Sequence, residues 1–112
     1  MPNIKSPFGA VDSFTLAATG TTALTIVNKV TMIDGVTTQI SGNATINLTL
    51  DARLEVGSVI YLKTATAATQ TVTFGTGFTC PTLTGVAGKT FSSAFIYDGI
   101  KFLPTAAPYQ IN

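Results

Sequence analysis

The chain has 112 residues, of which 46% are hydrophobic and 10% are charged, and its formal net charge is +1. This length accommodates one compact domain, and the apolar content excludes intrinsic disorder. The six basic residues are spread thinly along the chain, whereas binding to nucleic acid through charge needs a cluster of them, so that class of protein is excluded.

Apolar and polar residues alternate along much of the chain, which is typical of β-strands rather than helices. The clearest alternation lies at 44–50. Residues 59–62 are apolar on both faces, which predicts a strand in the middle of a sheet or one covered by a neighbouring subunit. We expect strands at 13–17, 22–33, 36–41, 44–50, 59–62, 71–74 and 90–97. Turn signals between them recur about every ten residues and predict an all-β domain, an antiparallel β-sandwich or a jelly-roll-like barrel.

Two Asp-Gly dipeptides predict tight turns, because both central positions of a type I′ turn need a positive φ. A two-residue turn at Asp98-Gly99 would place Tyr97 opposite Ile100 and Phe95 opposite Phe102, with these four side chains on one face. The same geometry at Asp34-Gly35 gives a less regular pattern, which fits a longer loop or a hairpin buried on both sides.

Both ends of the chain contain proline, which favours extended structure without a regular ladder. We therefore divide the chain into an N-terminal arm at 1–10, a β-sandwich domain at 11–103 and a C-terminal tail at 104–112. We expect these arms to contact a neighbouring subunit, with apolar contacts from Phe8, Tyr109 and Ile111.

The sequence offers little catalytic chemistry, and we expect no catalytic residue, no cofactor, no metal site and no enzyme activity. Histidine is absent and Cys80 is the single cysteine, so one chain cannot form a disulfide or a Cys/His zinc site. Nothing near Cys80 in the sequence would activate it, which favours a buried structural thiol. Residues 83–90 end like a phosphate-binding loop, but the first glycine of that motif is replaced by Leu83 and a strand pattern follows. They favour a glycine-rich connection into a strand.

The N-terminal residues 1–7 lack the apolar run of a signal peptide, and no stretch reaches the length of about 20 apolar residues that a membrane helix needs. We expect a protein that is made in a cytoplasm and does not contact a membrane. Tyr61, Tyr97 and Tyr109 have two interpretations, a platform that stacks on sugars or ordinary packing in a core or interface, of which packing is the default.

The pattern of residues 44–103 resembles small β-sandwich modules of bacteriophage virion proteins, such as head decoration, head fibre and tail spike proteins. The resemblance rests on the runs 55–64, 70–75 and 88–91 and on the aromatic–Asp–Gly–x–x–aromatic hairpin at 97–102. It implies a non-enzymatic structural protein that assembles as a homo-oligomer, usually a trimer, on the virion. Its partners would be copies of itself and the major capsid or other virion proteins. The alternative is a carbohydrate-binding or receptor-binding β-sandwich module with a glycan as its partner.

Overall fold

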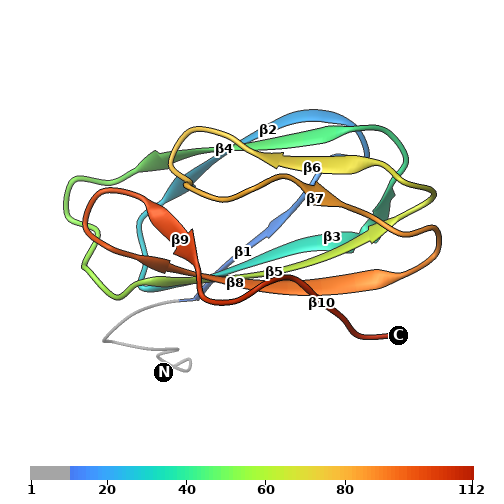
Figure 1. Ribbon diagram of the computed structural model, residues 1–112. Coiled ribbons are helices and arrows are strands. Elements are labelled where there is room, and N and C mark those ends of the chain that lie inside the picture. The colour runs from blue at the N-terminus through green and yellow to red at the C-terminus, as the bar shows by residue number, and fades with distance from the viewer. Residues whose placement is uncertain (1–10) are drawn as a thin grey trace, which may run out of the picture.

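The computed structural model describes residues 11–112, which form ten strands in two layers (Figure 1). Sheet A contains β1 (Val11–Thr15), β3 (Val30–Ile40), β5 (Val59–Thr66), β8 (Thr90–Tyr97), β9 (Phe102–Pro104) and β10 (Tyr109–Gln110). Sheet B contains β2 (Gly20–Ile26), β4 (Ala44–Leu50), β6 (Thr71–Phe74) and β7 (Leu83–Thr84). The predicted all-β, two-sheet architecture is confirmed.

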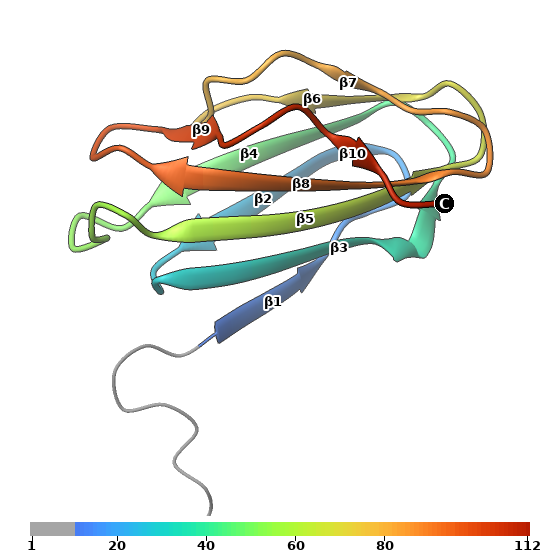
Figure 2. The ribbon, with the colours of Figure 1, turned by 60° about the horizontal axis from the view of Figure 1, so that its bottom comes forward.

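The first six strands alternate between the two sheets, so each pair of consecutive strands makes one coil of a flattened roll. Strands of successive coils pair in parallel: β1 pairs with β3 and β3 with β5 in sheet A, and β2 pairs with β4 and β4 with β6 in sheet B. Antiparallel pairing begins with β7 and β8, and β9 and β10 both add to the free side of β8 (Figure 2). The prediction of an antiparallel sandwich or jelly-roll-like barrel is therefore right only in part: the fold is a sandwich-like pair of sheets, but the sheets are mixed rather than antiparallel and do not close into a barrel. Parallel neighbours need a connection that crosses over, and here that connection is a strand of the other sheet.

Four predicted strands lie where the sequence placed them. The strands β4, β6 and β8 have the predicted bounds, and residues 59–62 lie in β5, which is central between β3 and β8. The predicted strand 22–33 is wrong, because a turn at 27–29 separates β2 from β3. Buried side chains are even-numbered before this turn (Leu24, Ile26) and odd-numbered after it (Thr31, Ile33), so the alternation changes phase there.

Asp98-Gly99 does not form the predicted two-residue turn, and Asp34-Gly35 forms neither the longer loop nor the buried hairpin that its pattern fitted. Asp34 and Gly35 lie inside β3 at a bulge, where three extra residues separate the pairs Gly35–Thr64 and Ile40–Thr66. No side chain fits at Gly35, because its Cβ would lie 2.9 Å from the carbonyl oxygen of Lys63.

The Asp98-Gly99 turn does join two antiparallel strands, and Gly99 has the predicted positive φ, +102°. Its loop, however, has four residues, because Tyr97 pairs with Phe102. The carboxylate of Asp98 accepts hydrogen bonds of 2.8 Å from the amides of Ile100 and Lys101, which stabilises this longer loop. Ile100 is consequently 75% exposed and does not share the buried face of Phe95, Tyr97 and Phe102.

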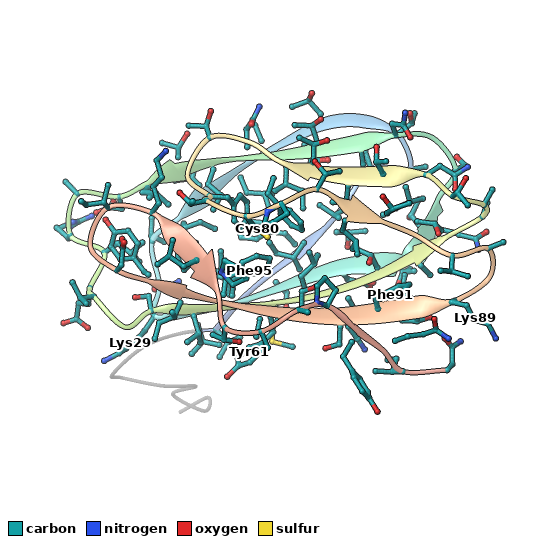
Figure 3. All side chains as sticks on the ribbon, in the orientation of Figure 1. Lys29, Tyr61, Cys80, Lys89, Phe91 and Phe95 are labelled. Atoms are coloured by element: carbon teal, nitrogen blue, oxygen red, sulfur yellow. The ribbon has the colours of Figure 1, made fainter. Side chains whose placement is uncertain are left out.

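The core lies between the sheets, and Figure 3 shows Phe95 pointing into it. Phe74, Phe78 and Phe95 form an aromatic cluster with ring centroids 5.0 to 5.1 Å apart. Burial of side chains of this kind contributes about 2 kcal/mol each. Residues 83–90 run from the short strand β7 through a turn into β8. They form the predicted glycine-rich connection into a strand, although β7 itself was not expected.

Candidate functional site: the outer face of sheet A

The outer face of sheet A is made by every second residue of its strands. Residues paired in register point to the same side of a sheet, so the side chains form rows across the strands. Row one contains Val11, Val30, Val59, Ile96 and Leu103. Row two contains Ser13, Met32, Tyr61 and Ala94. Row three contains Thr15, Asp34, Lys63, Ser92 and Tyr109.

This face gathers most of the exposed apolar side chains of the described residues. Residues 11–112 expose ten large hydrophobic side chains, and four of these lie in loops: Val27, Val56, Val86 and Ile100. The other six belong to sheet A or to the segment that continues β10: Val11, Met32, Tyr61, Ile96, Tyr109 and Ile111. A contiguous apolar patch on a protein of this size marks an interaction surface.

A hollow of about 550 Å³ lies in the middle of the face. Met32 and Tyr61 contribute its apolar wall, and Asp34 and Lys63 line its polar end. Figure 3 shows Tyr61 on the side of sheet A that points away from sheet B. The hollow can accept a bulky side chain or a small ring at its apolar wall and a charged or hydroxyl group at its polar end.

The polar end carries two opposite charges on neighbouring strands. Hydrogen bonds from the hydroxyl and the amide of Thr37 and from the amide of Val36 lower the pKa of Asp34 below its usual value. Attraction by Lys63 acts in the same direction, and partial burial of the carboxylate opposes it. The β3 bulge that supplies these amides therefore holds Asp34 as an anion beside the Lys63 cation.

Tyr109 and Ile111, two of the predicted oligomer contacts, follow the same edge of sheet A. Tyr109 is in row three with its side chain 70% exposed, while the backbone of β10 pairs with β8 of its own chain. The amide of Ile111 donates a hydrogen bond to the carbonyl of Thr90 at 2.9 Å. Phe8, the third, lies outside the described residues. Contacts of these residues with another copy stay a prediction.

The three tyrosines do not form one platform. Tyr97 packs in the core, its ring centroid 5.2 Å from that of Phe102, whereas Tyr61 and Tyr109 are on the outer face. Sequence reasoning missed the neighbours of Tyr61 on β3, because Met32 was assigned to a strand ending in a hairpin. The apolar pattern of 59–62 was the one signal that pointed to this face.

The remaining titratable groups are dispersed. Among residues 11–112 no three His, Cys, Asp or Glu side chains come together as a metal site would require. Asp51 pairs with Arg53 at 3.1 Å and Lys29 with Glu55 at 3.6 Å, both pairs at the surface. Cys80 is only partly buried, not fully as predicted, and packs against the edge of the core. Burial raises the pKa of its thiol, which disfavours the reactive thiolate.

The outer face of sheet B is polar in contrast. Its outward residues are Thr21, Ala23, Thr25, Thr45, Asn47, Thr49, Thr71, Thr73 and Thr84. The side-chain oxygen of Asn47 accepts a hydrogen bond from the amide of Thr76 at 2.9 Å and so ties β4 to the end of β6. A face of hydroxyl and amide groups can stay in contact with water and needs no partner subunit to cover it.

No family model, curated protein or solved structure matches the chain. Within residues 11–112, no helix has the length and apolar character needed to cross a membrane.

Proposed function

We propose that the protein is a non-enzymatic structural subunit that assembles with copies of itself on the surface of a bacteriophage virion. The observation that carries this proposal is the apolar outer face of sheet A, opposite a threonine-rich outer face of sheet B. Burial of such a face against another subunit stabilises the assembly by a free energy of about 25 cal/mol for each Å² of apolar area removed from water. The low net charge of +1 supports assembly as well, because it gives little repulsion between copies.

The virion assignment comes from the resemblance of residues 44–103 to phage decoration, fibre and spike modules. Under this proposal the partners are copies of the chain and the major capsid or other virion proteins, after synthesis in the host cytoplasm. The resemblance implies a trimer, and the number of copies is part of what the experiment measures.

Sedimentation velocity of the full chain from low to high micromolar concentration tests self-assembly. We expect an oligomer that Met32→Asp dissociates, because the new carboxylate lies in row two of the apolar face. Asn47→Asp is the matched control, since it adds the same charge to the outer face of sheet B and keeps an acceptor for Thr76. A wild-type chain that stays monomeric at high micromolar concentration would contradict the proposal. Antibody labelling of virus particles in electron micrographs tests the location, and unlabelled intact particles would contradict it.

The hollow favours a glycan-binding module as the second candidate. It places the ring of Tyr61 beside a carboxylate, an amine and the hydroxyls of Ser13 and Ser92, groups that can stack on and hydrogen-bond to a sugar. A glycan array probed with the wild-type chain and with Tyr61→Ala separates the two functions. Binding that Tyr61→Ala abolishes would favour this candidate.

A further inference from the structure

The order of side chains across the outer face of sheet A is self-complementary. We infer that two copies pack these faces together about a two-fold axis that runs parallel to the strands, between β3 and β5. This inference rests on the proposed self-assembly and adds to it the partner surface and a two-fold symmetry, in place of the trimer that the resemblance implies.

The rotation pairs like with like in row one and row two. The strand order in the sheet is β1, β3, β5, β8, so the axis places β3 opposite β5 of the second copy and β1 opposite β8. Val30 then faces Val59 of the second copy, and Met32 faces Tyr61. Apolar side chains meet apolar side chains along row one and at the centre of row two, where Ser13 faces Ala94 at the ends of the row, as in aligned packing of two sheets about 10 Å apart.

Row three fixes the position of the axis. Asp34 on β3 meets Lys63 of the second copy, and by symmetry Lys63 meets Asp34, which gives two ion pairs across the interface. An axis along β3 would instead oppose two Asp34 carboxylates, and an axis along β5 would oppose two Lys63 amines. An axis perpendicular to the strands would bury this charged row against the valines of row one, which is unfavourable because the charges would lose water without gaining a partner. Only the axis between β3 and β5 pairs opposite charges.

The area of the face suits a pair of this kind. The four strands β1, β3, β5 and β8 overlap; at a spacing of about 4.8 Å, with the eight residues of β5 at a rise of about 3.3 Å, they give a projected area of roughly 500 Å². Two faces then bury roughly 1,000 Å² in total, about the minimum for a specific interface. Tyr109 enlarges it, since the rotation brings β10 of one copy just beyond β1 of the other.

Cysteine cross-linking tests the axis directly, in a Cys80→Ser background. Ser13 on β1 and Ala94 on β8 occupy the same row and are opposite each other in the inferred pair. Two copies of Ser13, in contrast, would be displaced sideways by three strand spacings, about 14 Å. With a bis-maleimide shorter than that distance, a mixture of Ser13→Cys and Ala94→Cys should give cross-linked dimers, and neither variant alone should. Thr25→Cys, on the outer face of sheet B, is the control and should not link to Ser13→Cys.

Charge reversal tests row three. Lys63→Glu should raise the dissociation constant at least about tenfold, because the introduced carboxylate then faces the Asp34 carboxylate of the second copy. Lys89→Glu changes the net charge equally in an exposed loop and should leave the dissociation constant unchanged. An equal response of the two variants would overturn the inference.

The outcomes separate this inference from the proposed function. An oligomer that cross-links through Ser13→Cys alone, or that fails to cross-link in the mixture, overturns the symmetry and leaves self-assembly standing. A chain that is monomeric at all concentrations overturns both. A monomer that pairs only after deletion of residues 1–10 would identify that segment as the occupant of the face and also overturn the inference.

Discussion

The two outer faces of the sandwich share one backbone architecture and differ in their side chains. Both belong to three coils in parallel register, and both expose every second residue. Sheet A exposes valine, methionine, tyrosine and isoleucine, whereas sheet B exposes threonine and asparagine. Valine and threonine have the same branched shape and both fit a pleated sheet. The fold therefore tolerates either residue on an outer face. The difference in side chains fits the proposal that another copy covers sheet A while sheet B stays in contact with water.

The largest expected effect comes from making sheet A resemble sheet B. Val30→Thr, Val59→Thr and Ile96→Thr together retain β-branched residues, so the chain should fold. Each change removes about 1 kcal/mol of apolar burial from the interface. Each change occurs in both copies of the two-fold pair, so the sum of about 6 kcal/mol should raise the dissociation constant by about four orders of magnitude in analytical ultracentrifugation. Unchanged assembly would mean that the apolar side chains of sheet A do not form the interface, although the two faces differ in composition.

A change in the hairpin of sheet A should separate stability from assembly. Gly99→Val forces a β-branched residue into a φ of +102° and brings its Cβ to 3.3 Å from the Val56 side chain. We expect a loss of more than about 1 kcal/mol in the free energy of unfolding, measured with denaturant. Because the loop lies outside the three rows, the folded variant should associate like the wild type. A loss of assembly without a loss of stability would assign the loop to the interface.

Acid should act on sheet A and spare the outer face of sheet B, whose outward residues do not titrate. The folded-state pKa of Asp34 lies below its usual value of 3.8, so its contribution to stability is present above that value. As the pH falls through the folded-state pKa, the carboxylate becomes protonated and the contribution is lost, together with the attraction to Lys63. Stability and association should both decline below about pH 4, and Asp34→Asn should flatten the decline in a pH series of denaturant titrations. An unchanged slope in Asp34→Asn would assign the acid response to other carboxylates.

The smallest effect is expected on sheet B. Thr25→Ser and Thr49→Ser remove one exposed methyl group each from paired positions on the outer face. We expect a change within about 0.5 kcal/mol in the free energy of unfolding and none in the dissociation constant. A weakened oligomer would show that the polar face also contacts another subunit.

Local patterns in the sequence predicted much of the strand content, but not the order of strands in the sheets. The strands β4, β6 and β8 followed from alternation between turn signals. The pairing of Val11, Val30 and Val59 depends on residues far apart in the chain, and a turn signal does not say which sheet the chain enters next.

The Asp-Gly turns and the candidate site show the same limit. The carboxylates of Asp34 and Asp98 each accept hydrogen bonds from two backbone amides. These bonds stabilise a bulge at Asp34 and a four-residue loop at Asp98, which the dipeptide alone does not reveal. The pattern at 59–62 indicated one strand of the candidate face. The rows that complete it could not be assigned before the register was known.

The parallel coils have a consequence for the rate of folding. No coil can form its ladder until the next coil has been made, because β1 waits for β3 and β2 waits for β4. Closing these non-local pairs loses chain entropy before the contacts form, so this small protein should fold in milliseconds to seconds rather than in microseconds. During synthesis the N-terminal coils can stack in order, and sheet A is completed only when β8 has paired with β5 and the last strands, β9 and β10, have paired with β8.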